Sequence, residues 1–209
     1  MQRRWQGRRL AQLTIGTWWI LAAVACGGGD GQTLYAQRHD GRLSIAGLVG
    51  DVPVDWERRP DEPRIWAKYS RAALAPDRVG AELVVHYDPA DPGGAVEATL
   101  QHWVSQMSAP GGGDARRLEL RSRWTIDDAI IDLVVVDGIY QRSLGGGPMT
   151  GGRTRAEPGY RLVGMVVEGP AGRAFLRLVG PRRTAEAMEN ELRGLLAAAK
   201  PESISAGDR

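Results

Sequence analysis

Cysteine, phenylalanine and histidine are scarce in this sequence. Its 209 residues include one cysteine, one phenylalanine and three histidines. The single cysteine, Cys26, excludes an intrachain disulfide and any zinc or iron–sulfur site built from several cysteines. The sequence also lacks a His-Glu-x-x-His motif, a Gly-x-Ser-x-Gly motif and a glycine-rich loop ending in Gly-Lys-Ser/Thr. We therefore expect no catalytic residue set, no metal and no cofactor.

Net charge is nearly absent as well. The chain has 27 Lys+Arg against 25 Asp+Glu, with 43% hydrophobic residues, a composition typical of a globular domain with a packed core. Residues 1–25 hold four arginines and no acid, so without them 27 basic groups become 23 against 25 acidic groups, a formal charge of −2. A nucleic-acid-binding domain needs a persistent basic patch. We expect no nucleic-acid partner.

The N-terminus has the pattern of an export signal. Four arginines among residues 1–9 precede an apolar segment over residues 10–25, shorter than the roughly 20 residues of a membrane-spanning helix. Small residues at 23–25 precede Cys26, which resembles the lipobox of bacterial lipoproteins. That resemblance implies cleavage before Cys26, acylation of its thiol and, because Gly27 follows, sorting to the outer membrane facing the periplasm.

Two alternatives stay open for this segment. In the first, residues 1–25 form an uncleaved signal anchor in which Cys26 is a buried apolar residue. In the second, the arginine pair at 8–9 directs export by the twin-arginine route. In the cleaved case, the chain consists of a signal peptide (1–25), a lipidated cysteine with a flexible tether (26–41), a domain (42–200) and a disordered tail (201–209).

Apolar periodicity within residues 42–200 alternates between that of strands and that of helices. Strands are predicted over 43–48, 65–69, 81–88 and 129–136, and the segments 160–167 and 174–179 predict an antiparallel hairpin. Apolar residues at 96, 100, 103 and 107 predict a helix, and Thr184 is the predicted N-cap of a final helix with its apolar stripe at 188, 192, 195 and 199. This order predicts an α+β domain with a mostly antiparallel sheet.

Several segments resemble uncharacterised bacterial envelope lipoproteins of the planctomycete type. They are residues 52–56, 81–87, 93–97, 101–103, 147–149, 157–161 and 178–181, together with Gln106. The resemblance extends over about residues 52–200 and implies no particular activity. The order of strands and helices is also similar to the Mog1/PsbP-like fold, an architectural likeness that says little about function.

Two groups of polar side chains are candidate sites. His86 shares a strand face with Glu82 and lies near Asp88, so an oxygen- and nitrogen-ligated metal site can be drawn there, although a solvated strand face is the simpler interpretation. His102 lies about 100° from the apolar stripe of its helix and is expected in solvent.

The second group is acidic. Asp127, Asp128 and Asp132 could serve in acid–base or calcium chemistry, yet a polar turn explains them better because calcium-loop spacing is missing. Four tryptophans could line a ligand cavity, but their spacing is more typical of core residues: Trp56, Trp66, Trp103 and Trp124.

A long connection over residues 144–159 is the most unusual segment. It is rich in glycine and carries the apolar side chain of Met149 and two cations, Arg153 and Arg155. Connections of this length are either functional or disordered. The functional interpretation is a partner-binding loop.

These observations together predict a non-enzymatic interaction or accessory domain that is held at the membrane by a lipid anchor and binds an envelope protein. The alternative is a small-molecule binder or hydrolase-like enzyme that uses a cleft near His86.

Overall fold

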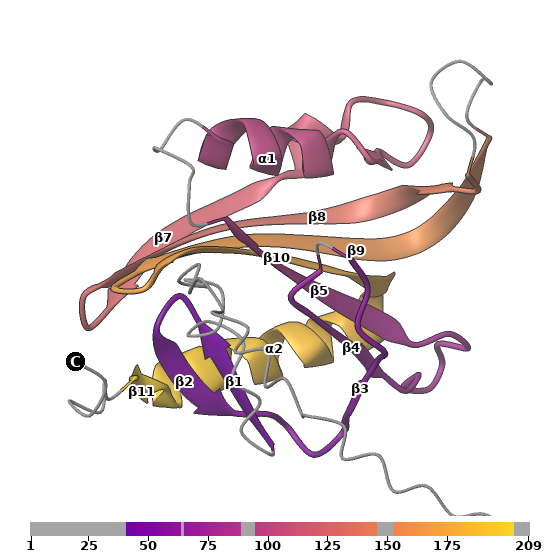
Figure 1. Cartoon of the computed structure of the whole chain (residues 1–209). Helices are drawn as coiled ribbons and strands as arrows, with labels where there is room; N and C mark the ends of the chain where they lie inside the picture. Colours follow the sequence, from indigo (N-terminus) through magenta and orange to yellow (C-terminus); the bar gives the residue numbers. More distant parts are fainter. Residues whose placement is uncertain (1–40, 64, 89–94, 146–152, 203–209) are drawn as a thin grey trace, which may run out of the picture. The chain divides into compact units, whose positions relative to one another are not determined.

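The computed structural model describes residues 41–63, 65–88, 95–145 and 153–202 (Figure 1). Its elements in chain order are β1 (Arg42–Ile45), β2 (Leu48–Asp51), β3 (Trp56–Arg58), β4 (Ala67–Arg71), β5 (Ala81–Asp88), α1 (Ala95–Val104), β6 (Met107–Ser108), the 3-10 helix η1 (Ala115–Leu118), β7 (Leu120–Ile126), β8 (Ala129–Ser143), β9 (Thr154–Gly169), β10 (Gly172–Pro181), α2 (Arg182–Ala198) and β11 (Lys200–Pro201).

The strands form two antiparallel sheets. The larger sheet has the order β3-β4-β5-β10-β9-β8-β6, with β7 also paired to β8. The smaller sheet has the order β1-β2-β11. The predicted hairpin of 160–167 with 174–179 is confirmed, because β9 and β10 pair in register from Gly172↔Gly169 to Pro181↔Tyr160. The α+β class with a mostly antiparallel sheet is therefore as expected.

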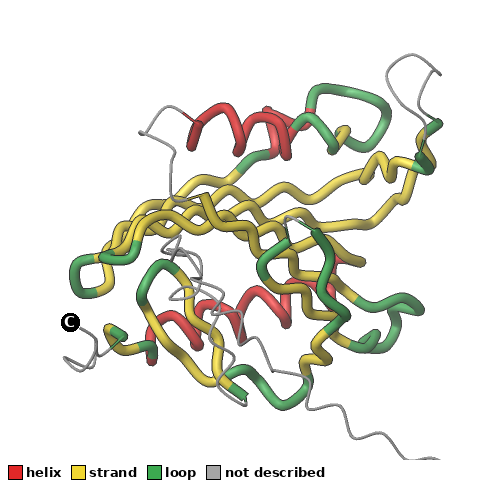
Figure 2. The backbone as a smooth tube through the Cα atoms, in the orientation of Figure 1, coloured by secondary structure: helices red, strands yellow, loops and turns green. Residues whose placement is uncertain are grey.

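The two helices cover opposite faces of the large sheet (Figure 2). Alternate residues of β8 divide between two cores: Ile131 and Leu133 pack with α2, whereas Val134 and Val136 pack with α1. The predicted stripe of the final helix lies in the first core, where Met188 and Leu192 are fully buried. A strand that is apolar on both faces requires a layer on each.

Helix α1 approaches the sheet over a glycine. A Cβ atom on Gly164 of β9 would lie 2.7 Å from the ring of Trp103 and 3.2 Å from a methyl group of Leu100. The glycine therefore allows the Trp103 ring to lie directly on the strand backbone, and the side chain is 6% exposed. His102, one residue earlier, is exposed as predicted.

The small sheet packs on α2. Residues 43–48, predicted as one strand, instead form a hairpin in which Ala46 and Gly47 turn the chain with φ of 53° and 86°. The period-two pattern did not reveal the turn because Ala46 is itself buried. Strand β11 then pairs with β2, and the Glu202 amide donates to the Gly47 carbonyl at 2.8 Å, so ordered pairing continues beyond residue 200.

The start of α2 differs from the prediction. The helix begins at Arg182, and the N-cap position belongs to Pro181, whose side chain makes no capping hydrogen bond. Thr184 lies in the first turn, where its amide and its hydroxyl both donate to Asp77 Oδ2, at 2.8 and 2.7 Å. A carboxylate from the loop before β5 thus replaces the local cap, and negative charge is favourable at a helix N-terminus.

Two further boundaries differ. Helix α1 ends at Val104, and Met107 lies in β6, where its side chain is buried in the same core as the helix stripe. Strand β9 begins at Thr154, so the last six residues of the predicted 144–159 loop belong to a strand. The tryptophans are core residues: Trp56 and Trp103 are buried, while Trp66 and Trp124 are partly buried against the α2-side core.

Substituting Trp103 tests the packing of α1. We expect Trp103→Ala to lower the free energy of unfolding by about 3–5 kcal/mol, because a buried indole is lost above a glycine that cannot fill the space. The matched control, His102→Ala, changes an exposed side chain on the next residue and should change stability by only about 0.5 kcal/mol. Urea unfolding measures both. Equal losses of stability in the two variants would show that the Trp103 side of α1 does not face the sheet.

Candidate functional site

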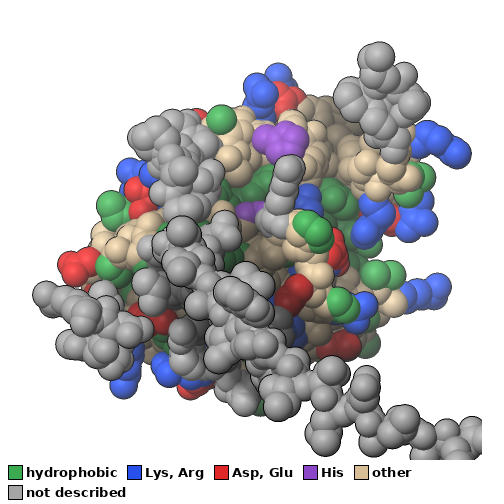
Figure 3. All heavy atoms as spheres, viewed as in Figure 1, with side chains coloured by type: hydrophobic (Ala, Val, Ile, Leu, Met, Phe, Trp, Pro, Cys, Tyr) green, Lys and Arg blue, Asp and Glu red, His purple; other side chains and the backbone are tan. Residues whose placement is uncertain are grey.

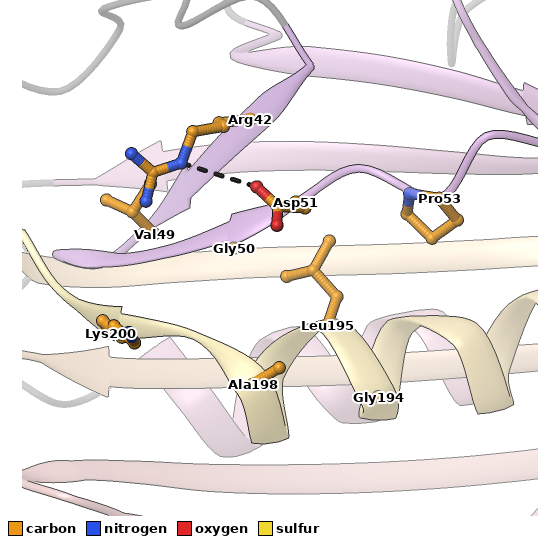
Figure 4. Close-up of a pocket in the computed structure, with 9 residues that line it drawn as sticks. All are labelled: Arg42, Val49, Gly50, Asp51, Pro53, Gly194, Leu195, Ala198 and Lys200. Carbon is orange, nitrogen blue, oxygen red and sulfur yellow. Dashed lines mark ion pairs between the residues drawn. The ribbon is translucent and has the colours of Figure 1, made fainter.

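A surface hollow of about 360 Å³ lies between β2 and the C-terminal end of α2 (Figure 4). Strands β1, β2 and β11 form one wall and the last turns of α2 form the other. The lining residues are Arg42, Val49, Gly50, Asp51, Pro53, Gly194, Leu195, Ala198 and Lys200. A site of this volume is large enough for a small ligand or for a few side chains of a partner.

Two glycines shape this hollow. A Cβ atom on Gly50 would lie 2.8 Å from the side chain of Leu195, so β2 packs its bare backbone against the helix. A Cβ atom on Gly194 would meet nothing within 4 Å, so that side of the helix faces open space. Gly50 therefore allows β2 and α2 to approach closely, and Gly194 leaves space between them.

Charge lies at the rim of the hollow. Arg42 Nε and Asp51 Oδ1 are 3.6 Å apart, and their side chains are 47% and 91% exposed. Lys200 is exposed just beyond the end of α2, where the helix carbonyls carry partial negative charge. The lining therefore combines an apolar wall from Val49, Leu195 and Ala198 with two cations and one carboxylate. Such a lining can bind an amphipathic group, but it contains no nucleophile beside a base.

A part-buried ion pair holds the same helix to strand β4 and does not face the hollow. Arg71 of β4 donates from Nη2 to Glu191 Oε1 at 2.9 Å and from Nε to Oε2 at 3.0 Å, and Trp56 Nε1 donates to Oε2 at 2.7 Å. Burial works to raise the pKa of Glu191, but the hydrogen bonds from Arg71 and Trp56 outweigh it and hold the pKa below its usual value. The Glu191 carboxylate is therefore ionised, and both of its oxygens accept hydrogen bonds.

A second network links β8 and β9 to α2. Arg161 donates to Asp137 Oδ1 at 2.7 Å and Oδ2 at 3.0 Å, and also to Glu189 Oε2 at 3.1 Å. The Arg193 Nε donates to the other oxygen of Glu189 at 3.0 Å. The hydrogen bond from Arg161 is the main cause of the lowered pKa of Asp137. The two arginines and the two carboxylates of this network therefore neutralise one another.

Both histidines of the described residues lie on the α1 side of the large sheet, His86 on strand β5 and His102 on α1 itself. His86 is half-buried on β5 opposite Phe175, and its strand neighbour Val84 is buried in spite of its place on the predicted polar face. His102 on α1 lies 3.3 Å from Gln106, nitrogen to nitrogen. Figure 3 shows histidine side chains in the upper part of the surface, where Figure 1 places α1.

His86 lines neither the hollow beside β2 nor a second, very small one at Trp66 and Tyr87. The described residues hold no group of three or more His, Cys, Asp or Glu positioned for a metal ion.

The acidic triplet does not form one site. Asp127 and Asp128 make the exposed turn between β7 and β8, where Asp127 has a φ of 48°. Asp132 accepts two hydrogen bonds of 2.7 Å from Arg123 of the neighbouring strand. The polar-turn interpretation of the first two residues is confirmed.

The predicted partner-binding residues are only partly described. Arg153 and Arg155 are exposed at the end of the β8–β9 hairpin, and Arg155 donates to Glu157 Oε1 at 2.7 Å. Met149 and Cys26 lie outside the described residues. Sequence reasoning missed the hollow, because Arg42 and Lys200 stand far apart in the chain and only the pairing of β2 with β11 brings them together.

Comparison with known proteins adds little. No protein-family model and no curated protein matches the chain. Among solved structures, PA94 from Pseudomonas aeruginosa, a protein of unknown function with a suggested regulatory role, is similar with a TM-score of 0.39 and 15% sequence identity. That match covers 77% of this chain and 95% of PA94. At this similarity we draw nothing from it.

Filling Gly194 tests the geometry of the hollow. We expect Gly194→Ala to raise the free energy of unfolding by about 0.5–1 kcal/mol, because alanine favours a helix interior and its Cβ meets open space. Gly50→Ala is the matched control and should destabilise the domain, since its Cβ collides with Leu195. Thermal unfolding compares them. Loss of stability in Gly194→Ala would show that the hollow is closed.

Proposed function

We propose that this protein is an exported, lipid-anchored domain of the cell envelope that binds a partner and performs no chemistry. One observation carries the binding role: the hollow beside β2 has an apolar wall with charges only at its rim. The least exposed arginines that make ion pairs with α2, Arg71 and Arg161, lie elsewhere and hold the helix to the sheet. A binding domain needs such a surface and a rigid frame, whereas a catalyst needs converging reactive groups.

The lipid anchor and envelope location rest on the sequence alone. The arginines of residues 1–9, the short apolar segment and Cys26 support export and acylation. Among the described residues, no helix has the length and apolar character required to cross a bilayer. Sorting to the outer membrane, with the domain in the periplasm, is part of the proposal because Gly27 follows the cysteine.

A Mog1/PsbP-like architecture is also part of the proposal. It is supported by the antiparallel order of the strands, with one helix in the middle of the chain and one after the last long strand. The alternative function, catalysis or small-molecule binding in a cleft near His86, gains no support from the two hollows, since neither contains that residue.

Acylation of Cys26 is the first test of the proposal. Mass spectrometry of membrane-extracted protein should show a chain that begins at Cys26 and carries added acyl mass. The Cys26→Ser variant should appear in the soluble fraction, because a thiol is required for the lipid. A full-length chain with unmodified Cys26 would contradict the lipid anchor and would favour the alternative, an uncleaved signal anchor.

The end of the β8–β9 hairpin is the second test. We expect Arg153→Ala combined with Arg155→Ala to weaken capture of an envelope partner in a pull-down, because both cations are exposed and can pair with carboxylates. The melting temperature should remain nearly unchanged, since exposed charges contribute about 0–1 kcal/mol to stability. Arg59→Ala, another exposed arginine, is the control. Unchanged capture by the double variant would remove the hairpin end from the binding surface.

A further inference from the structure

Strand β2 has an open backbone position on the side where it pairs with β11. Because the β1–β2 turn has two residues, Leu48 and Gly50 exchange backbone hydrogen bonds with β1. Val49 and Asp51 therefore direct their N–H and C=O groups to the other side of the strand. Val49 meets Lys200 of β11 there. Asp51 meets no described strand on that side, because β11 has only two residues and follows directly on the C-cap of α2.

This open backbone position lies in the wall of the hollow beside β2. Asp51 lines the hollow together with Leu195 of α2, which points toward β2 in Figure 4. The lining has little net charge, because Arg42 and Asp51 lie opposite each other and Lys200 is its one other charged residue. A suitable occupant therefore offers an extended backbone to Asp51 and neutral, apolar side chains to the helix.

A neutral apolar segment occurs in the chain itself, just before the domain. Residues 33–36, Thr-Leu-Tyr-Ala, lie outside the described residues and hold the one run of adjacent apolar side chains between Cys26 and Gly41. Threonine and tyrosine favour an extended backbone. The chain also enters the domain at the hollow, since the Gly41 carbonyl accepts from the Val52 amide at 2.8 Å and Arg42 belongs to the lining.

Covalent linkage favours this segment over a separate peptide of the same chemistry. Leu34 precedes Gly41 by seven residues, and seven extended residues span at most about 23 Å. A segment joined through so short a linker has an effective concentration of about 1 mM. A separate peptide of equal affinity would compete equally only at that concentration. Proximity along the chain, and not charge, thus selects the occupant.

We infer that residues 33–36 dock in the hollow as a short added strand whose backbone pairs with Asp51. Leu34 and Ala36, which point the same way in a strand, lie against Leu195. This inference rests on the hollow proposed above as a binding surface and names an occupant for it. The segment is a competitor within the chain, and an envelope partner enters the hollow only by displacing it.

Disulfide cross-linking of the full chain in mild detergent tests the inference. Cys26→Ser removes the native thiol, and Ala36→Cys with Gly194→Cys supplies the reporter pair. A Cβ atom on Gly194 meets nothing within 4 Å, so a thiol there is accessible from the hollow. We expect a cross-link within the chain under mild oxidation, formed at a rate that is independent of protein concentration and followed on non-reducing gels.

Variants of the reporter chain locate the contact. Leu34→Ser should slow cross-linking by about tenfold or more, because it removes the apolar side chain that fills the hollow, a change of about 1.4 kcal/mol. Gln32→Ser, outside the segment, is its control. Ala198→Glu places a charge in the lining and should slow the reaction as strongly. Ala197→Glu changes an exposed residue that does not line the hollow and should leave the rate unchanged.

Three results would overturn the inference. They are a rate that does not respond to Leu34→Ser, equal slowing by the two glutamate variants, and cross-links between chains that increase with protein concentration. Partner capture in a pull-down is measured separately. If Ala198→Glu weakens capture while cross-linking does not respond, the hollow is a partner surface and only the docking of residues 33–36 fails. The converse result removes the partner from the hollow and retains the docked segment.

Discussion

The fold depends on one constraint: its three longest strands are apolar on both faces. Strands β8, β9 and β10 place residues such as Leu133 and Met165 toward α2 and Val134 and Val166 toward α1. Such strands are stable only when each face is covered. Helix α2 covers one face with the small sheet packed against it, and α1 covers the other through Trp103. The hollow beside β2 lies between α2 and the small sheet that packs against it.

Two arginines hold α2 to the large sheet in addition to the apolar core. Arg71 bridges β4 to Glu191 of α2, and Arg161 bridges β9 to Glu189, two residues earlier on the same helix. The forked guanidinium holds two carboxylate oxygens at once, which fixes orientation as well as charge. Every carboxylate in these networks is hydrogen-bonded, so they hold α2 to the sheet, and none of their residues lines the hollow.

The sequence predicted what depends on local periodicity and missed what depends on distant contacts. The β9–β10 hairpin, the buried stripe of α2 and the exposure of His102 follow from spacing alone. Periodicity reports burial and not backbone conformation, so Met107 looked helical although it lies in a strand beside the helix. The carboxylate that binds Thr184 belongs to Asp77, 107 residues away, and the hollow requires the backbone of β2 at Gly50 to pack against Leu195 of α2. No local pattern contains that information.

The order of strands in the large sheet also determines when the domain can form. Strand β5 joins the sheet only through β10, whose pairing with it runs from Arg173↔Asp88 to Val179↔Glu82. Strands β3, β4 and β5 pair with one another locally, but they join the rest of the sheet only after β10, which starts 84 residues beyond the end of β5, has been made (172 − 88 = 84). Contacts of such long range slow folding. For the export proposed above, a sheet that is completed late is favourable, because a chain that has not reached its final fold can pass through a narrow translocation channel.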